Sequence, residues 1–442
     1  MISKREIDIV LKNSKILFWL AGPIILSNLL HSFYNLADTY YMGKLGSIEL
    51  AAASFTSPIT QMIIGAGTGF SVGGGIIISQ VFGKKDKKQL IEMSSQLLSI
   101  NLILSMIIML ISFIFCENIL IFSGASSELL DKSSLYIKFI FATIPMTFIV
   151  SSYTTIKNCK GKTIAPLYLI FYSVLLNIIL NSIFVYKLKM GLFGIGLATL
   201  IANLLLSIYC LYDLKIRKEI SLNYFKIKYN NLKRIVKLGV PSSITAMTNA
   251  LSFIVINTFV VKYGNEVLAA YGIGNRINSI IYVLVNGIGS AIAILVGQNI
   301  GARKLKQAKK VLKIGMGVGI ILGILMIILL YLNLNYILNL LTNDNLIKYH
   351  SKNYVIIMLA SIILWVIFQS FSGVFQGTGH TKFNMYCHFG RVWFFRLPFI
   401  YFFEKILRMN EFSIWYSMLF SNLFVLMFSI LLYQKVNWYK KI

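Results

Sequence analysis

The sequence has few charged residues and very few acids. Of its 442 residues, 13% are charged and only 15 are acidic, whereas hydrophobic residues make up 57%. Soluble domains carry roughly 25% charged residues, because charge covers the surface that faces water. The composition therefore excludes a water-soluble protein of this length.

Cysteine and histidine are also scarce, with four of each. Cys116, Cys159, Cys210 and Cys387 stand singly in or at the ends of apolar runs, and no spacing matches a disulfide framework or a metal site. An enzyme within the membrane would need paired carboxylates, a histidine cluster, or a nucleophile with its base. None of these is visible, so we expect no catalytic residue, no metal and no cofactor.

Long apolar runs recur along the whole chain. A helix rises about 1.5 Å per residue, so a run of about 20 residues crosses the roughly 30 Å hydrocarbon core of a bilayer. The runs are continuous and lack the alternation of barrel strands, which indicates helices. We predict an all-α polytopic membrane protein with about 12 transmembrane helices. The runs lie near residues 16–42, 50–82, 93–116, 134–156, 164–186, 191–214, 238–261, 268–297, 311–334, 353–375, 385–403 and 413–433.

The net charge of +27 could suggest a nucleic-acid partner, but its distribution argues otherwise. Lys and Arg gather in the termini and in alternate connections, of which 216–237 is the largest, and we group Lys382 and Arg391 with these cytoplasmic cations. The other connections carry nearly balanced charge. This is the positive-inside pattern, and it predicts a multi-pass protein of the cell membrane with both termini cytoplasmic. Because no solvated basic domain is present, we expect lipid headgroups and no nucleic acid as partners.

The chain repeats itself at an offset of 218 residues. Chance does not readily align prolines, glycines and glutamines at one fixed offset. The aligned pairs include Pro23 with Pro241, Gly46 with Gly264, Gly69 with Gly287, and Gln80 with Gln298.

The repeat predicts two six-helix bundles, residues 1–215 and 238–442, joined by a cytoplasmic linker at 216–237. Since six is an even number, both copies insert in the same orientation and are related by a pseudo-twofold axis along the membrane normal. Such an architecture places a cavity between two lobes and permits transport by alternating access.

One acid, Asp38, falls well inside a predicted span, and we expect it to be the only acid within the hydrocarbon, since Asp213 stands at the very end of its run. A carboxylate in hydrocarbon costs roughly 2.5–3.5 kcal/mol, so it usually faces a cavity and has a function. Its helical neighbours are Tyr34, Asn35, Tyr41 and, two turns back, His31. We expect Asp38 to carry protons beside a substrate cavity; the alternative is that it lies near the outer helix end and reaches headgroup water.

Polar side chains one helical turn apart mark the fifth and sixth spans. Asn177 and Asn181 share one face, and Thr199 and Asn203 share another. Such pairs can be plain interhelical contacts. Gathered with Asp38, they would form an ion or proton site.

Three further residues are candidates for the transport cycle. Pro23 lies inside the first span and predicts a kink that acts either as a hinge or as a static bend. Arg276 could contribute charge to the substrate cavity or reach headgroups. Tyr153 could line the cavity or merely pack against neighbouring helices.

Several short motifs are spread along essentially the whole chain. They are Pro23 with the segment from Asp38 to Gly46, Leu50-Ala51-Ala52, Gln80 and Gly83, Asn275-Arg276-Ile277, the segment from Gly297 to Ala302, the segment from Gly377 to Thr381, and the segment from Arg391 to Pro398. Together they resemble the multidrug and toxic compound extrusion (MATE) family, in its DinF-like branch.

The resemblance implies antiport, in which proton or sodium entry drives the export of small organic, often cationic, compounds. The family's ion site uses a first-helix Asp, an Asn and an Asp on the fifth helix, and a sixth-helix Thr. Asp38, Asn177 and Thr199 match these types, whereas Asn181 stands where the second acid would be. With one carboxylate fewer, a bound Na+ would be less well neutralised, so we expect H+ rather than Na+ as the coupling ion. We also expect the protein to be a monomer.

Two other classes of membrane transport protein remain open. A flippase for lipid-linked precursors or oligosaccharides would favour a cavity rich in cationic side chains, for which Arg276 is the main candidate. A channel would show a ring of charges or a filter-like loop, and none is visible.

Overall fold

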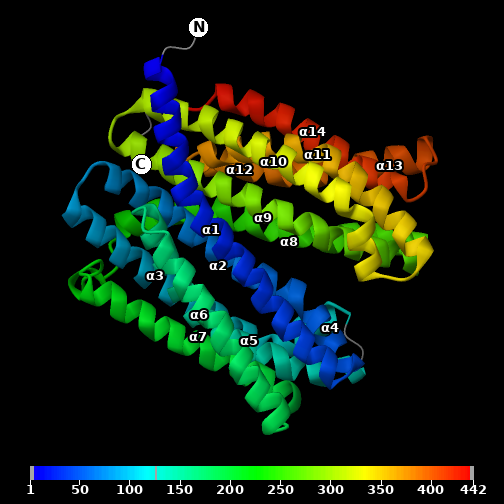
Figure 1. Ribbon diagram of the computed structural model, residues 1–442. Helices are drawn as coiled ribbons and strands as arrows, with labels where there is room; N and C mark the ends of the chain where they lie inside the picture. Colours follow the sequence, from blue (N-terminus) through cyan, green and yellow to red (C-terminus); the bar gives the residue numbers. More distant parts are fainter. Residues whose placement is uncertain (1–3, 125–126, 439–442) are drawn as a thin grey trace. The chain divides into compact units, whose positions relative to one another are not determined.

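The computed structural model describes residues 4–124 and 127–438, and within these ranges the chain forms helices and no strand. The predicted all-α class is confirmed (Figure 1). The first repeat contains α1 (Lys4–Leu45), α2 (Ser47–Gly83), α3 (Lys87–Ile114), α4 (Cys116–Phe122), α5 (Ser127–Cys159), α6 (Ile164–Ser182), the π-helical η1 (Ile183–Lys187) and α7 (Gly191–Ile216). After the 3-10 turn η2 (Leu222–Tyr224), the second repeat contains α8 (Tyr229–Val260), η3 (Val261–Tyr263), α9 (Asn265–Gly301), α10 (Leu305–Leu341), α11 (Asn345–Gly377), α12 (Thr381–Gly390), the π-helical η4 (Arg391–Arg396), α13 (Leu397–Tyr401), the π-helical η5 (Phe402–Ile406) and α14 (Phe412–Gln434).

Among the described residues, 11 helices are long and apolar enough to cross a membrane. The remaining predicted span, 385–403, lies in the consecutive elements α12, η4, α13 and η5. Two π-helical segments divide this run, so no single α-helix in it reaches the length of a span. The protein is a multi-span membrane protein.

The 218-residue repeat reappears in the helix bounds. Adding 218 to the bounds of α2 gives the bounds of α9, and adding 218 to those of α5 gives those of α11. The π-helical turn η1 has its counterpart in η5, which begins one residue later than the offset requires. By contrast, η4 falls where the first repeat has the unbroken α6.

The chain forms two compact units, and their boundaries lie inside helices. One unit, here called the N-unit, is Leu26–Ala250; the other, the C-unit, holds the chain up to Ile25 and from Leu251 onward. Thus α1 changes unit just after Pro23, and α8 changes unit nine residues after Pro241. The predicted lobe boundaries at 215 and 238 stay a prediction, and their outer ends at 1–3 and 439–442 lie outside the described residues.

Two equivalent glycines show how the units exchange these helices. A Cβ atom on Gly69 of α2 would lie 2.1 Å from the backbone nitrogen of Ser243 in α8, within the N-unit. A Cβ on Gly287 of α9 would lie 2.3 Å from Cγ1 of Ile25 in α1, within the C-unit. Ile25 and Ser243 are themselves one repeat apart. Small residues let helix backbones approach closely. Thus α2 packs against the first part of α8, and α9 packs against the first part of α1.

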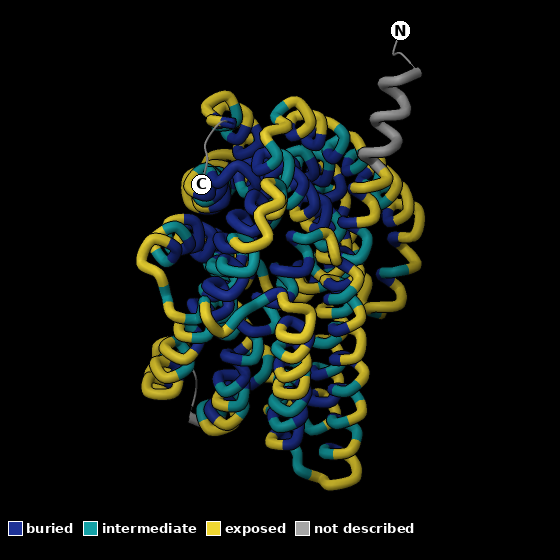
Figure 2. Tube along the Cα trace, turned by 90° about the vertical axis from the view of Figure 1, so that its left-hand side faces the viewer, coloured by how far each residue is buried: buried dark blue, intermediate teal, exposed yellow. Residues whose placement is uncertain are grey.

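The helices carry large apolar side chains on their exposed faces. Figure 2 shows exposed and buried residues in alternating stripes along individual helices. Phe122, Leu332 and Phe394 are 95%, 75% and 70% exposed. In a chain with spans of this length, such faces contact lipid, because lipid tails solvate them as well as a protein core would.

The glycine contacts yield a stability prediction. We expect Gly69→Ala to destabilise the protein by roughly 1–3 kcal/mol, because the added Cβ meets backbone and the helices must move apart. Gly287→Ala should cost less, since the Ile25 side chain can shift. The measurement is the thermal unfolding midpoint of purified protein in detergent.

Gly317→Ala on α10 is the matched control, because no atom lies within 4 Å of the place that the added Cβ would take. A helix gains about 1 kcal/mol from this change, so the midpoint should stay or rise. Equal midpoints for Gly69→Ala and Gly317→Ala would show that the exchanged packing is not needed for stability.

Candidate functional site

Asp38 lies within α1 and is buried, with 7% of its surface exposed. It points toward two other helices of the N-unit, α6 and α7. Asn181 of α6 donates from Nδ2 to Asp38 Oδ1 at 2.8 Å, and Thr199 of α7 donates from its hydroxyl to Asp38 Oδ2 at 3.4 Å. Each carboxylate oxygen therefore accepts a hydrogen bond from a neutral group.

The amides of α6 connect Asp38 to the rest of the cluster. Asn177 and Asn181 are fully buried. Asn181 Nδ2 also donates to Asn177 Oδ1 at 3.1 Å, and Asn177 Nδ2 donates to the Tyr34 hydroxyl at 3.0 Å. Helical spacing explains the arrangement, because side chains four residues apart lie above one another on one face.

One buried acceptor in the cluster has no partner among the described residues. It is Oδ1 of Asn181. A buried polar atom without a hydrogen bond costs about 1–3 kcal/mol, so such atoms call for an explanation. A carboxylate beside an unpartnered carbonyl oxygen is chemistry that suits a proton or a small cation.

The structure brings the four predicted coupling residues together: Asp38, Asn177, Asn181 and Thr199. Their role stays a prediction. Of the predicted cavity residues, Tyr34 joins them directly, and Asn203 donates to the backbone oxygen of Thr199 at 2.8 Å.

The other predicted cavity residues of α1 lie around this cluster. Tyr41 is buried, and its hydroxyl contacts Ser182 Oγ at 2.6 Å on α6. His31 and Asn35 are exposed, and the His31 ring lies edge-on to Tyr34 at a centroid distance of 6.3 Å. The substrate role of these residues is untested.

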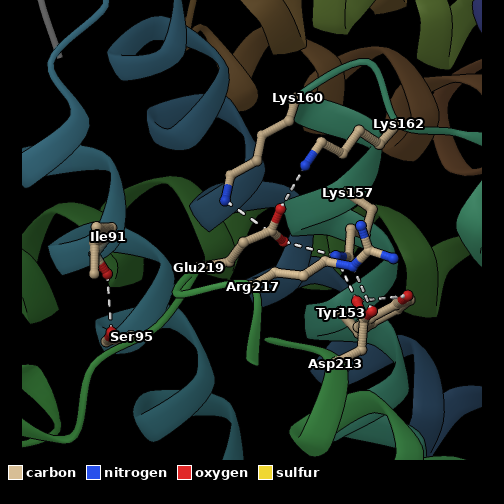
Figure 3. A network of polar contacts seen from close by, with 9 residues as sticks. All are labelled: Ile91, Ser95, Tyr153, Lys157, Lys160, Lys162, Asp213, Arg217 and Glu219. Atoms are coloured by element: carbon tan, nitrogen blue, oxygen red, sulfur yellow. Dashed lines mark hydrogen bonds and ion pairs between the residues drawn. The ribbon is translucent and has the colours of Figure 1, made fainter. Parts of the chain in front are cut away.

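Tyr153 belongs to a different polar cluster of the N-unit (Figure 3). Its hydroxyl donates to Asp213 Oδ2 at 3.2 Å, and the ammonium of Lys157 lies 2.5 Å from the same oxygen. Lys157 is 1% exposed and also contacts Glu219 at 2.9 Å. Whether Tyr153 also lines a substrate cavity stays a prediction; the contacts that it makes are those of this second cluster.

Asp213 corrects the expectation of a single acid within the spans. It is buried near the end of α7, where Arg217 also contacts it at 2.6 Å. Lys160 and Lys162 contact Glu219 from the turn before α6. Four cations and two carboxylates thus join the ends of α5 and α7 to the turn before α6, as Figure 3 shows. An acid two residues from the end of a predicted span was the available signal.

The remaining predicted residues lie elsewhere. Pro23 lies within α1, which continues through it as a helix. Arg276 is exposed on α9 of the C-unit. The described residues include no group of three or more His, Cys, Asp and Glu side chains that could hold a metal ion.

Sequence reasoning places one buried arginine wrongly and misses another. The charge pattern groups Arg391 with the cytoplasmic cations and gives Arg396 no role. In the structure both are buried, at 9% and 4% exposed, in η4 within the apolar run at 385–403. The signal that could have identified them is that the apolar run 385–403 contains two arginines and no acid.

Comparison with known proteins identifies the family. The MatE family profile matches the chain twice, over residues 23–183 and 241–402. The matches begin at Pro23 and Pro241, which are one repeat apart. The chain belongs to the MatE family. It is therefore a membrane transporter and not an enzyme.

Curated relatives and solved structures agree with this assignment. The chain is 26% identical to the probable multidrug resistance protein YoeA of Bacillus subtilis, over 95% of this chain and 93% of YoeA. It is 27% identical to the multidrug export protein MepA of Staphylococcus saprophyticus, over 81% of this chain and 80% of MepA. The crystal structure of a mutant of the Vibrio cholerae MATE transporter VcmN matches with a TM-score of 0.92 at 20% identity, covering 97% of this chain and 99% of that one. This last likeness concerns the fold alone, and the DinF-like branch stays a prediction.

The charges of the Lys157 cluster give a pH prediction. Burial would raise the pKa of Glu219, but Lys157, Lys162 and Lys160 hold it below its ordinary value of 4.5. Burial lowers the pKa of Lys160 to about 8, although Glu219 opposes this. Because the folded pKa of Glu219 is depressed, its stabilisation is present above pH 4.5 and is lost as the pH falls through the folded pKa.

We expect Glu219→Gln to lower the unfolding midpoint at pH 7, because it leaves Lys157 buried with one carboxylate partner fewer, at a cost of about 3 kcal/mol. Its midpoint should also fall less than that of the wild type as the pH is lowered from about 5 to about 3. Glu117→Gln, at an exposed acid, is the control and should follow the wild-type profile. A Glu219→Gln profile parallel to the wild type would count against this account.

Proposed function

We propose that this chain is a secondary active exporter, in which protons entering at Asp38 drive organic compounds out of the cell by alternating access. The observation that carries the proposal is the buried carboxylate of Asp38, which accepts hydrogen bonds from a neutral amide and a neutral hydroxyl. A charge in this position is expensive, and a proton removes it.

Protonation changes which hydrogen bonds the cluster can make. The ionised carboxylate accepts from Asn181 and Thr199. The protonated acid must donate one bond, and Oδ1 of Asn181, which has no partner among the described residues, can accept it once its amide rotates. Loading and unloading of the proton therefore favour two different arrangements of α1 against α6 and α7.

Helix α1 is suited to carry this change beyond the site. Tyr34, Asp38 and Tyr41 all contact α6 or α7, whereas the residues up to Ile25 belong to the C-unit. Pro23 removes one helical hydrogen bond close to this boundary. We propose that α1 bends near Pro23 when Asp38 is protonated, so that substrate leaves toward the outside. One charge moving inward down 100 mV supplies about 2.3 kcal/mol.

Protons suit the site better than Na+. Asp38 is the one carboxylate of the cluster, since Asn181 occupies the position of the second acid. Hard cations favour several oxygen ligands of high charge, whereas a proton needs a single carboxylate. Sodium is the alternative that the experiment below separates.

The names of the relatives guide the choice of substrate. YoeA and MepA are described as multidrug resistance and multidrug export proteins. We propose small organic compounds, cationic or amphiphilic, as substrates. The protein would act as a monomer in the cell membrane, with both termini cytoplasmic, no cofactor and no nucleic-acid partner.

A flippase for lipid-linked precursors or oligosaccharides is the second candidate. The observation that favours it is the pair of buried arginines in η4, because phosphate groups of such lipids prefer guanidinium partners.

Replacing Asp38 tests the coupling. We expect Asp38→Asn to reduce proton-driven export at least tenfold, because Asn keeps the shape but cannot exchange a proton. The measurement is efflux of a fluorescent organic cation from proteoliposomes under an imposed proton gradient, and separately under a sodium gradient.

Asp131→Asn is the matched control, since Asp131 is exposed on α5 and should not affect export. Export by Asp38→Asn at the wild-type rate would eliminate this mechanism. Export by the wild type under a sodium gradient but not under a proton gradient would identify Na+ as the coupling ion. The variant Asn181→Asp adds the missing carboxylate and should increase the response to sodium.

A further inference from the structure

The elements of the Asp38 site have counterparts one repeat later. Asp38, Asn181 and Thr199 lie on α1, α6 and α7, whose equivalents are α8, the segment α12–η4–α13, and α14. Helices α12 and η4 contact α14 in the C-unit. We propose that this second set of helices holds an anion-binding site centred on Arg396 and Arg391.

Arg396 joins α8 and α14 through neutral groups. Its Nε donates to Ser421 Oγ at 3.2 Å, and its Nη1 donates to Ser252 Oγ at 3.4 Å. Ser252 and Ser421 stand one repeat after Tyr34 and Asn203. The guanidinium thus occupies the place in the C-unit that the polar cluster around Asp38 occupies in the N-unit.

The charge of Arg396 has no carboxylate partner among the described residues. None of their ion pairs includes it. The phenolic hydroxyls of Tyr271, Tyr282 and Tyr354 interact with it electrostatically. Removing an ion from water costs several kcal/mol even after the protein relaxes. A buried cation kept at that cost without a carboxylate indicates a ligand of opposite charge.

The polarity of the second site is the reverse of the first. One repeat after Asp38, Asn177 and Asn181 stand Ile256, Phe395 and Phe399. The acceptor groups of the first site are therefore replaced by apolar side chains. Cationic donors appear instead, on the same segment of helix.

The π-helical turn η4 aligns the two arginines. In an α-helix, residues five apart differ by about 140° around the axis, because each residue turns by about 100°. A π-helix bonds residue i to residue i+5 and so stacks them on one side. Arg391 and Arg396 begin and end η4, which the first repeat lacks. Such turns occur frequently at functional sites.

The surrounding side chains offer further donors and aromatic surface. The Arg391 guanidinium lies 4.5 Å from the centroid of the Trp365 ring, and Tyr282 lies edge-on to that ring at 5.5 Å. Trp365 Nε1 is buried and has no partner among the described residues. It is a hydrogen-bond donor, as an anion requires.

These features define the ligand class as an aromatic or amphiphilic compound that bears a carboxylate or phosphate. A planar guanidinium binds either group through two parallel hydrogen bonds. Trp365 and Tyr282 supply flat surface for an aromatic body. The step from binding to export rests on the proposed function, whereas the binding itself does not.

The test compares two probes that differ in one charge. Purified full-length protein in detergent is titrated calorimetrically with 1-naphthoate and with its uncharged methyl ester. We expect the wild type to bind the acid at least tenfold more tightly than the ester. Arg396→Gln should remove this preference, and Arg396→Lys should retain part of it.

Arg303→Gln is the matched control, because Arg303 is an exposed arginine of the same unit. It should keep the wild-type ratio. Equal affinities for acid and ester in the wild type, or an unchanged ratio in Arg396→Gln, would overturn the proposal. Should Arg396→Gln fail to fold, the wild-type ratio together with Arg391→Gln decides the question.

Nanodiscs separate an exported compound from a lipid headgroup. In phosphatidylcholine discs, naphthoate binding should match that in phosphatidylglycerol discs. Weaker binding in phosphatidylglycerol would overturn the assignment to an exported compound, because the bilayer would then supply the anion. If export does not depend on Asp38 but the wild type still prefers the acid to the ester, only the proposed function is rejected. If export depends on Asp38 but the wild type binds acid and ester equally, only the anion site is rejected.

Discussion

The bond network around Asp38 depends on the cost of keeping a charge away from water. Asn181 and Thr199 stabilise the carboxylate through hydrogen bonds, yet neither carries a positive charge. A lysine or arginine at this place would fix the carboxylate in its ionised form, as Lys157 does for Asp213. Neutral partners hold the acid in position and allow it to be either protonated or ionised. This is the property that a proton-coupling site would need.

The two repeats show one scaffold with two different sets of polar side chains. The helix bounds of α2 and α5 recur in α9 and α11, and the glycine contacts of α2 with α8 recur between α9 and α1. Backbone geometry is therefore preserved in these helices, whereas η4 departs from it. The side chains that face the equivalent positions are not preserved, because Asp38 is matched by Ile256 and the buried charge of the second repeat is on Arg396. Duplication supplies the framework, and substitution within it changes which ligand can be held.

Local properties of the sequence explain what could be predicted from it. Hydropathy over about 20 residues located the spans, and four-residue spacing placed Asn177 with Asn181 and Thr199 with Asn203. Non-local packing explains what the sequence could not supply. Tyr153 lies beside Asp213 because α5 and α7 meet, and Arg391 is buried in η4 although the charge pattern groups it with the cytoplasmic cations. Helix α1 passes from one unit to the other after Ile25 because of contacts far along the chain.

Charges buried for stability and charges buried for function differ in how they are compensated. In the cluster of Figure 3, every carboxylate contacts at least two cations, so the ends of α5 and α7 are joined by paired charges that gain from remaining together. Asp38 and Arg396 are equally buried but contact neutral amides and hydroxyls. Stability alone would favour apolar residues at such positions, since replacing uncompensated charge by packed hydrophobic side chains is often neutral or stabilising. Retention of charge at two repeat-equivalent sites, with opposite sign, is therefore best explained by ligands that supply the missing counter-charge.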